Sequence, residues 1–411
     1  MNEVSIPFGK KELKFDIPNN KYEIIDVEDK RKKELKGNEM KEIIIKFIQN
    51  LPLKGKKNIS IAIPDITRPK IPQGVLQVIL ENLVKSFQGY IYIFIGTGLH
   101  SFTQSDIYEM IPRQFINHEK IRIKFHDANS DDNIYIGDTE KGTPIYVEKE
   151  YYYSDLKLSI GVVEPHQFAG FSGGSKGVVI GLGGEKTISR NHALIMDPRS
   201  RIGIIKGNPL REDIEEAGQM ININYLINFV MNLDNKPMNI ICGENPESFR
   251  KTVNYIKELT GYKVGKKYDL VITSPGGFPR DIDLYQAQKA ITPALSICKD
   301  GGIILLISEC PRGSGEREYL ELIKQVKTPE KLVKNFDLEN FKVGPHKSLL
   351  FAKAALNHQL YLYTNNKSMN NELSGTFINP IKDITEFLKE NAYDKTIAIL
   401  PRAIQVLPVL D

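Results

Sequence analysis

The sequence of 411 residues predicts an α/β fold: two α/β domains with mostly parallel sheets and the active site in the cleft between them. Two observations carry this prediction. Short apolar runs of strand length alternate with segments of helical spacing, and polar or glycine-rich loops follow the apolar runs. The same order of strand, loop and helix then begins again in the second half of the chain, as expected of α/β architecture.

The first half contains four apolar runs that we expect to be strands. A helix is predicted after the prolines at positions 69 and 72, where apolar residues recur with helical spacing over residues 75–85. The charged stretch 28–36 is expected to be a solvated helix. The predicted strands cover residues 59–63, 90–95, 121–125 and 156–163.

The second half is expected to begin with a strand over residues 269–273, followed by a helix near 284–298 and a strand over 302–308. The basic segment 261–267 before this restart is the best candidate for a domain boundary. We therefore predict an N-terminal domain over residues 1–265 and a C-terminal domain over 266–394. The apolar tail 395–411 is expected to join the N-terminal domain.

Composition excludes several classes of protein. The chain has 55 basic and 51 acidic residues, a balance too even to indicate a nucleic-acid partner. Its longest apolar runs fall far short of the ~20 residues that span a bilayer, and no secretory signal is visible at the N-terminus. Only three cysteines occur, which favours the reducing cytoplasm. We expect a cytoplasmic enzyme without nucleic-acid or membrane partners.

Three histidines lie in or just after glycine-rich loops that follow predicted strands, where ligands bind in open α/β sheets. They are His100, His166 and His192. A single histidine is more often a satisfied structural side chain, but three in such loops favour catalysis or metal binding. The remaining four have no such context and are expected to be structural: His118, His126, His346 and His358.

The glycine-rich stretches do not match the nucleotide-binding motifs. The segment that ends in Ser175-Lys176-Gly177 fails the spacing of a P-loop, and Gly96-Thr-Gly98 lacks the third glycine of a dinucleotide fingerprint. Such loops can still bind a lone phosphate through backbone N–H groups, although a tight turn is the better interpretation of any single glycine pair. Lys176, which lies among glycines and serines, is placed to neutralise a phosphate or to form a covalent bond to a carbonyl-type group.

Six motifs, taken in order, resemble the nickel-pincer lactate racemase family, the LarA-like 2-hydroxyacid racemases and epimerases. The resemblance covers about residues 55–310, and the long block that ends at Lys176 is its most specific part. The motifs are Asp65-x-Thr-Arg68-Pro, Gly96-Thr-Gly-x-His100, Glu164-Pro-His166-x-x-x-Gly-Phe-Ser-Gly-Gly-x-Lys176, Asn191-His192-Ala193, Gly207-Asn-Pro and Gln286-x-x-Lys289.

The resemblance implies a cofactor, the Ni(II) pyridinium-3-thioamide-5-thiocarboxylate mononucleotide known as the nickel-pincer nucleotide. It implies that Lys176 forms the covalent attachment and that His192 completes the nickel coordination, with sulfur donors that suit Ni(II). Cofactor maturation proteins are then expected partners. Further residues expected to bind the cofactor are Asp65, Arg68, Gly96, Thr97, Gly98, Gly173 and Gly174.

The resemblance also implies racemisation or epimerisation of a 2-hydroxy carboxylic acid, with lactate as the first candidate. Its histidines His100 and His166 would be the acid/base pair, while hydride transfer avoids placing a carbanion beside a carboxylate. Substrate contacts are expected from Arg68, Tyr285, Gln286 and Lys289.

Two departures from the family bear on the substrate. Ser101 follows His100 where many members carry an arginine, and the chain has no tryptophan, a residue that contributes to the substrate pocket in some lactate-active members. Two alternatives stay open: an NAD-dependent hydroxyacid dehydrogenase, which lacks support from a complete dinucleotide fingerprint, and a non-catalytic carrier of a nucleotide or metal. The substrate's side chain and the oligomeric state are left open.

Overall fold

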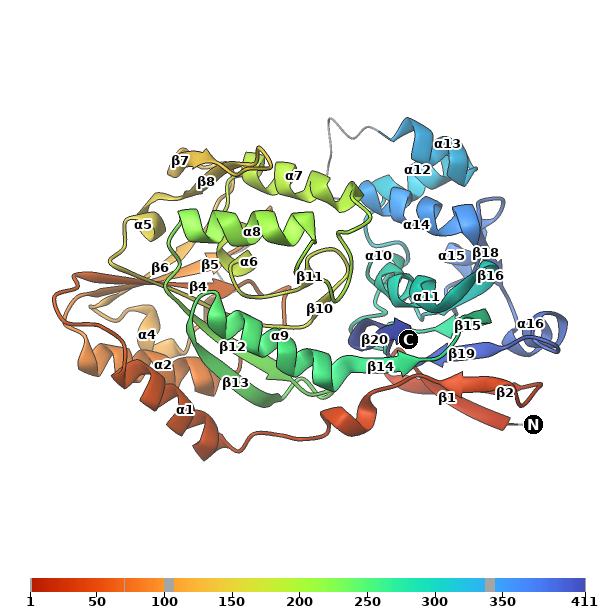
Figure 1. The fold of residues 1–411 in the computed structure, drawn as a ribbon, viewed down its shortest axis with the longest axis horizontal. Helices are drawn as coiled ribbons and strands as arrows, with labels where there is room; N and C mark the ends of the chain where they lie inside the picture. Colours follow the sequence, from red (N-terminus) through yellow and green to blue (C-terminus); the bar gives the residue numbers. More distant parts are fainter. Residues whose placement is uncertain (1, 70, 100–106, 337–343, 411) are drawn as a thin grey trace. The chain divides into compact units, whose positions relative to one another are not determined.

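The computed structural model describes residues 2–69, 71–99, 107–336 and 344–410, which form two α/β units (Figure 1). The central unit is Glu28–Leu259, and the terminal unit combines Met1–Val27 with Thr260–Asp411. The predicted fold class, α/β with mostly parallel sheets, is confirmed. Within the described ranges no helix is both long and apolar enough to span a bilayer.

The central unit is built on a six-stranded sheet with the order β13-β12-β9-β4-β5-β6. All neighbouring pairs are parallel except β12 and β13. The four strands predicted from the first half of the sequence are all present in it. The strands are β4 (Asn58–Pro64), β5 (Tyr90–Gly96), β6 (Ile121–Phe125), β9 (Leu156–Val162), β12 (Tyr225–Met231) and β13 (Pro237–Glu244).

Helices cover both faces of this sheet, which explains why its strands are apolar along their whole length. On one face, alternate isoleucines such as Ile59, Ile61 and Ile63 pack in a core with α1 (Gly37–Gln49) and α2 (Gln73–Ser86). On the other face, α6 (Lys176–Val179) packs against β4 and β9, and α8 (Pro209–Met220) packs against α6. Figure 1 shows α6, α7 and α8 on the side of the sheet opposite α1 and α2.

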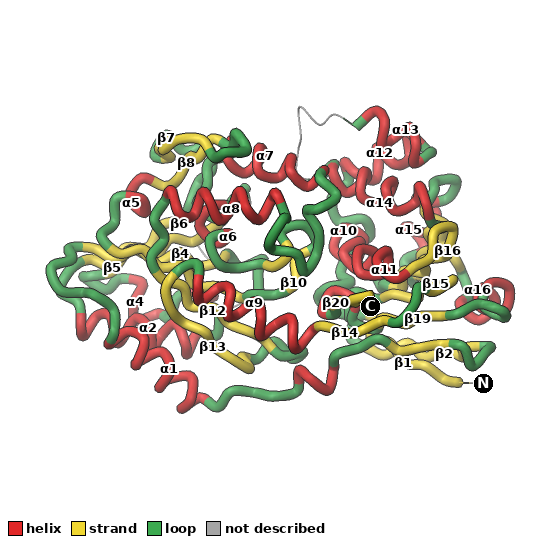
Figure 2. The backbone as a smooth tube through the Cα atoms, viewed as in Figure 1, coloured by secondary structure: helices red, strands yellow, loops and turns green. Residues whose placement is uncertain are grey.

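The loops that follow β4, β5 and β9 converge, because these strands are neighbours and parallel and therefore end at the same edge. Most of the chain between β9 and α6 is loop (Figure 2). The remaining elements of the unit are η1 (Glu28–Arg31), α3 (Ile107–Met110), α4 (Arg113–Ile116), β7 (Asn133–Asp138), β8 (Pro144–Glu148), α5 (Lys149–Tyr152), β10 (Pro165–His166), β11 (Gly170–Phe171), α7 (Glu185–Ala193), η3 (Leu194–Met196) and α9 (Glu247–Thr260).

The terminal unit is built on a second six-stranded sheet, with the order β18-β17-β16-β15-β19-β3 and every pair parallel. The hairpin of β1 (Asn2–Phe8) and β2 (Lys11–Ile17) shares one apolar core with this sheet and α16 (Ile384–Asn391). The strands of the sheet are β3 (Tyr22–Ile24), β15 (Tyr268–Thr273), β16 (Cys298–Ile307), β17 (Gln359–Tyr363), β18 (Ile378–Ile381) and β19 (Ile397–Leu400).

The segment predicted as one helix over residues 284–298 is divided in the structure. It forms α10 (Leu284–Ala287), η4 (Gln288–Ala290) and α11 (Ile291–Ile297), and Cys298 already begins β16. The other elements of the terminal unit are β14 (Gly261–Val264), α12 (Glu318–Val326), α13 (Pro329–Asn335), α14 (His346–Asn357), α15 (Lys367–Leu373), η5 (Ala403–Gln405) and β20 (Leu407–Leu410).

The predicted domain composition needs two corrections. The tail 395–411 does not join the N-terminal domain, because β19 pairs with β15 and β20 pairs with β14 inside the terminal unit. The first 27 residues belong to the same unit, because β3 extends its sheet beyond β19. Pairing between strands far apart in sequence leaves no trace in local composition, so the linear pattern assigned both segments wrongly.

The stretch 28–36 is also not a solvated helix. Only Glu28–Arg31 forms a short 3-10 helix, and Arg31 is buried with its guanidinium donating to the carbonyl of Met231.

Candidate active site

The loop after β4 folds around the carboxylate of Asp65. Asp65 is 3% exposed, and its Oδ1 accepts hydrogen bonds from Thr67 N at 2.6 Å and Thr67 Oγ1 at 2.5 Å. Its Oδ2 lies 3.8 Å from Nε of Arg68, whose side chain is 48% exposed. The aspartate thus sets the turn, and it leaves the guanidinium of Arg68 accessible to an anion.

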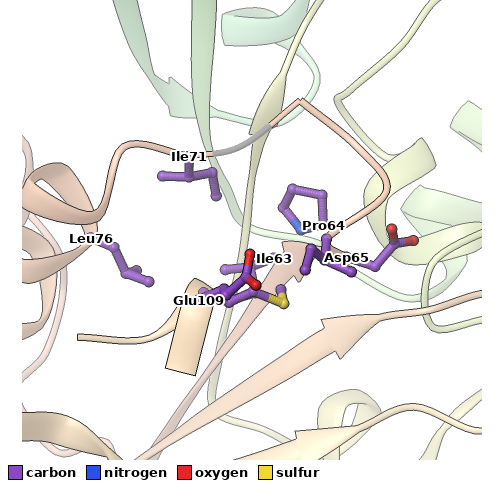
Figure 3. Close-up of a pocket in the computed structure, with 8 residues that line it drawn as sticks. Ile63, Pro64, Asp65, Ile71, Leu76 and Glu109 are labelled. Atoms are coloured by element: carbon purple, nitrogen blue, oxygen red, sulfur yellow. The ribbon is translucent and has the colours of Figure 1, made fainter. Parts of the chain in front are cut away.

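A small pocket lies beside this loop, and in Figure 3 the Asp65 carboxylate extends away from Ile71 and Leu76 on the opposite wall. Its volume of about 20 Å³ accommodates little more than one water molecule. The pocket therefore has no room for an organic cofactor. It is lined by Ile63, Pro64, Asp65, Ile66, Ile71, Leu76, Glu109 and Met110.

Gly96, the last residue of β5, and Gly98 in the loop that follows are required by close packing of the backbone. A Cβ at Gly96 would lie 3.1 Å from the Cα of Gly181, and Gly98 has a positive φ of 56° while its N–H donates to the carbonyl of Gly181. The hydroxyl of buried Thr97 donates to the carbonyl of His126 at 2.6 Å. This loop is thereby fixed against the segment that follows Lys176. His100, predicted as a catalytic base, lies outside the described residues.

The loop after β9 contains a small hairpin in which His166 pairs with Gly170. Nδ1 of His166 accepts hydrogen bonds from the backbone N–H groups of Phe168, at 3.3 Å, and Ala169, at 3.1 Å. A proton on Nδ1 would oppose both donors, so the neutral ring carries its proton on Nε2. His166 therefore presents an N–H donor in this conformation.

The glycines before Lys176 are also required by packing. Both have positive φ, 71° at Gly173 and 61° at Gly174. A Cβ at Gly173 would lie 2.6 Å from Val163 Cγ2, and one at Gly174 would lie 2.7 Å from a guanidinium nitrogen of Arg211. Only glycine fits both the conformation and the space, and the chain then enters α6 at Lys176.

A hydrogen bond to the backbone fixes the orientation and the tautomer of the His192 ring. Its Nδ1 lies 2.8 Å from the carbonyl oxygen of Ile188, one turn earlier in α7, so Nδ1 is the donor and Nε2 carries the lone pair. Burial, together with the nearby charges of Lys176 and Arg68, lowers the pKa of His192 to about 4, although the hydrogen bond to Ile188 opposes the shift. A neutral imidazole whose second nitrogen donates to a backbone carbonyl is the usual form of a metal-binding histidine.

Arg68, Lys176 and His192 thus come together in the central unit, and we refer to them as the lysine–histidine cluster. In the part of the chain that the structure describes, no group of three or more histidine, cysteine, aspartate or glutamate side chains is arranged to bind a metal ion. One neutral imidazole beside one lysine could hold a cofactor through a covalent link to the amine and a metal bound to the imidazole.

In the terminal unit the predicted substrate residues lie on one short helical segment. The carboxylate of Asp283 caps α10 by accepting from Gln286 N at 2.7 Å, and Nζ of Lys289 donates to Oε1 of Gln286 at 2.6 Å. The ring of Tyr285 packs edge-on against His346, with centroids 6.3 Å apart. Tyr285, Gln286 and Lys289 therefore form a single group with fixed orientations.

Sequence reasoning missed Lys347, a lysine that is only 2% exposed. Its Nζ donates to Gln288 Oε1 at 2.7 Å and lies 5.0 Å from the centre of the Tyr285 ring. Burial lowers the pKa of Lys347 well below its ordinary range, and Lys289 lowers it further, whereas Asp283 raises it. We refer to Tyr285, Lys289 and Lys347 with Asp283 as the tyrosine–lysine cluster. No local pattern distinguishes Lys347 from surface lysines.

The histidines expected to be structural include two that are buried. His126 has Nε2 2.9 Å from the carbonyl of Gly183 and Nδ1 3.4 Å from a carboxylate oxygen of Glu148. Nδ1 of His346 accepts from Gly344 N at 3.1 Å. The contacts of His126 join segments far apart in the sequence, whereas the hydrogen bond to His346 is local to the start of α14.

Comparison with known proteins identifies the family. Residues 8–203 match the lactate racemase N-terminal domain, and residues 264–407 match the lactate racemase C-terminal domain. The lactate racemase of Thermoanaerobacterium thermosaccharolyticum is 28% identical over 428 residues, covering 99% of each chain. The lactate racemase of Lactiplantibacillus plantarum is 28% identical over 316 residues, covering 75% of this chain and 74% of its own.

Solved structures agree in fold. The lactate racemase apoprotein from T. thermosaccharolyticum superposes with a TM-score of 0.86 at 26% identity, covering 99% of this chain and 100% of its own. A Thermotoga maritima protein superposes with a TM-score of 0.69 at 16% identity, covering 93% of this chain and 100% of its own, which shows a shared fold.

Proposed function

Because this chain belongs to the lactate racemase family, a family of isomerases, we propose that it racemises or epimerises a small 2-hydroxy carboxylic acid, with lactate as the first candidate. The proposal is supported by relatives named lactate racemase, one of which it matches over 99% of both chains. The tryptophan-free sequence leaves room for a substrate larger than lactate.

We further propose that the nickel-pincer nucleotide attaches to Lys176 and that His192 binds its nickel. The observation that carries this proposal is the state of His192, which is neutral above about pH 4, is oriented by the Ile188 carbonyl and lies near Lys176. When bound, the group would supply a soft-ligand nickel centre and a pyridinium carbon that accepts and returns a hydride. Lys176 would anchor it, and the Nε2 lone pair of His192 would fill one position on the metal.

The proton of the substrate hydroxyl would be exchanged by His166 on one face and by His100 on the other. With Nδ1 occupied by two backbone donors, Nε2 of His166 is the nitrogen that would exchange the proton. As an N–H donor it can bind the oxygen of a 2-oxo acid. To accept a proton at Nε2, the ring must give up the contacts with Phe168 and Ala169, so proton transfer at this face is coupled to a small loop movement.

Binding of the substrate carboxylate would fall to cationic and amide groups. Arg68 has an accessible guanidinium that can bind a carboxylate through two N–H groups. Gln286 and Lys289, joined by their own hydrogen bond, would bind the carboxylate or the carbonyl oxygen, and Tyr285 would pack beside the substrate. Such binding holds the acid while its reacting carbon presents either face.

We propose that the enzyme acts in the cytoplasm and receives its cofactor from maturation proteins there. The three cysteines, Cys242, Cys298 and Cys310, form no disulfide, and burial raises the pKa of each thiol to about 12. Unreactive, unpaired thiols are typical of proteins from a reducing compartment.

The proposal is tested by producing the chain with the maturation proteins and nickel, and then measuring intact mass, nickel per chain and loss of optical rotation of L- and D-lactate. The expected result is a covalent mass increment, about one nickel per chain and conversion in both directions. A panel of longer 2-hydroxy acids identifies the preferred substrate. Racemisation by protein without added mass, or oxidation that requires free NAD, would overturn the proposal.

A further inference from the structure

The Gly207-Asn-Pro motif begins α8, a helix to which neither the cofactor nor the substrate proposal assigns a role. Three polar side chains at its start are buried: Asn208 and Arg211 are 0% exposed, and Asp213 is 1% exposed. Fully buried charged side chains are rare in proteins unless they are paired. Their partners therefore show what the helix holds in place.

Arg211 holds the loop that leads to Lys176. Its Nη1 donates to the carbonyl oxygens of Phe171, at 3.2 Å, and Gly173, at 3.3 Å, and Nη2 also donates to Gly173 at 3.3 Å. The guanidinium carbon lies 3.9 Å from the centre of the Phe249 ring. A planar group with several donors can bridge two carbonyls and stack at the same time, which a lysine cannot do.

The contact continues to the residue next to Lys176. Arg211 pairs with Glu215 one turn further along α8, and Ser175 Oγ donates to Glu215 Oε2 at 3.1 Å. A Cβ at Gly174 would lie 2.7 Å from Nη2 of Arg211, so the loop lies directly against the guanidinium. The position at which α6 begins is thus set by side chains of α8.

Asp213 holds the helix that carries His192. Its Oδ2 accepts from Nδ2 of Asn191 at 2.7 Å, and its Oδ1 accepts from Thr139 Oγ1 at 2.5 Å. Asn191, which is 1% exposed, directly precedes His192, and its Nδ2 also donates to the carbonyl of Leu210 in α8 at 3.3 Å. The rotation of α7 about its own axis is therefore fixed from α8.

Asn208 connects α8 to the loop that contains His166. Its Oδ1 caps α8 by accepting from Arg211 N at 3.1 Å, while its Nδ2 donates to the carbonyl of Phe168 at 2.7 Å. Phe168 N is one of the two donors to the ring of His166. One turn of a single helix thus contacts the segments of His166, Lys176 and His192.

We propose that Arg211 and Asp213 are positioning residues of the active site, acting through the Lys176 loop and the His192 helix respectively. The inference rests on the proposed function for the roles of Lys176 and His192. The contacts of Arg211 and Asp213 themselves are made between protein residues and do not depend on a cofactor. Because both residues are on α8, they fix the separation between the cofactor's covalent anchor and its metal ligand. A small change in this separation would misplace the reacting groups and lower the rate of the reaction.

The first test uses apoprotein and needs no cofactor. Amide hydrogen exchange is measured in Arg211→Met and Asp213→Asn, with Ile214→Val as a control that disturbs the same buried helix without removing a polar contact. Arg211→Met should speed exchange at least about tenfold in residues 171–177, and Asp213→Asn should do so in residues 185–193. The control should change neither segment selectively. Uniform changes, or none, would overturn the proposal.

The second test uses protein produced with the maturation proteins. Arg211→Met should reduce the fraction of chains with a mass increment, and Arg211→Lys should not restore it. Asp213→Asn should leave the increment but reduce nickel affinity by roughly 10–100-fold and lower kcat more than it raises KM. Nickel affinity and kcat equal to those of the unaltered chain in Asp213→Asn count against Asp213 as a positioning residue.

The two proposals fail differently. If even the unaltered chain acquires no mass increment and no nickel, the proposed function is wrong, while the exchange data on apoprotein still test the role of α8. If the unaltered chain is fully loaded and active, and Arg211→Met and Asp213→Asn match it in loading, kcat and segment exchange, the positioning proposal is wrong and the function stands.

Discussion

Each unit contains one cluster of positively charged side chains, and the two clusters differ in the charged groups that surround their titratable residues. In the lysine–histidine cluster, the charged groups that shift the pKa of His192 are both cations, Lys176 and Arg68. In the tyrosine–lysine cluster, a carboxylate is present: Asp283 raises the pKa of Lys347, and both Lys289 and Lys347 lower the pKa of Asp283 against the larger effect of burial. In the first cluster Arg68 also lies 3.8 Å from the Asp65 carboxylate, but the charges that shift the pKa of His192 are cationic, whereas in the second cluster a carboxylate shifts the pKa of Lys347.

The difference indicates which cluster is prepared to receive an anionic group. Neighbouring cations disfavour a second proton on His192, and the same cations would attract an incoming phosphate or carboxylate. In the tyrosine–lysine cluster, Asp283 and the amide oxygens of Gln286 and Gln288 already bind the polar groups. Changes in the first cluster should therefore affect cofactor loading, and changes in the second should affect stability and substrate binding.

The largest effect is expected from Lys176→Ala. Without the amine no covalent link can form, so the mass increment should be absent and racemisation should fall below detection, while far-ultraviolet circular dichroism stays unchanged. Lys251→Ala, which removes an exposed lysine paired with Glu247 on α9, is the matched control and should leave loading intact. A surviving increment in Lys176→Ala would place the anchor elsewhere.

His192→Ala should separate attachment from metal binding. The mass increment should persist, because Lys176 is unchanged, but nickel affinity should fall by more than the roughly 10–100-fold that loss of a residue hydrogen-bonded to a metal ligand costs. Metal analysis after dialysis against a chelator measures this loss. Nickel content equal to that of the unaltered protein would remove His192 from the coordination sphere.

Acidification should destabilise the metal-free protein through His192. Its pKa falls from 6.5 to about 4 on folding, so between these values the unfolded chain binds a proton that the folded chain does not. The free energy of unfolding should therefore decrease as pH falls from about 6.5 to about 4, by up to roughly 3 kcal/mol. Urea unfolding of His192→Gln should show a shallower dependence over this range, and parallel curves would contradict the assignment.

The smallest effect is expected from Lys347→Met in the tyrosine–lysine cluster. The substitution removes a costly buried ammonium but leaves Gln288 without its donor, so the net loss of stability should be only about 1–2 kcal/mol. KM should rise more than kcat falls, because Tyr285 loses the cation beside its ring. Lys353→Met, on the same helix and half-buried, controls for loss of a charge from α14. A change in nickel loading in Lys347→Met would contradict the expectation that only the lysine–histidine cluster affects cofactor loading.

Much of the central unit could be predicted from the sequence. The strands near 59–63, 90–95, 121–125 and 156–163 are present because they are apolar on both faces, a pattern that local composition reveals. The order of motifs also identified the family, which the domain matches confirm. The sequence also indicated Lys176 and His192 as candidate site residues, because each lies in or shortly after a glycine-rich loop that follows a strand.

Other features could not be predicted from the pattern. Arg211, Asp213 and Lys347 look like ordinary surface charges in the sequence, and only burial against distant segments distinguishes them. The glycines at 173 and 174 suggested phosphate binding, yet their contacts with Val163 and Arg211 suffice to require glycine.

The sequence by itself determined the α/β class, the strands of the central sheet and the residue types available for chemistry, since these depend on local hydrophobicity and turn preference. The tertiary structure alone decided that strands from both ends of the chain join the second sheet and that α8 contacts the segments of His166, Lys176 and His192. It also decided that His192 is neutral with its Nε2 lone pair retained. Each of these depends on hydrogen bonds, burial or charge between residues far apart in the chain, and no local pattern encodes those distances.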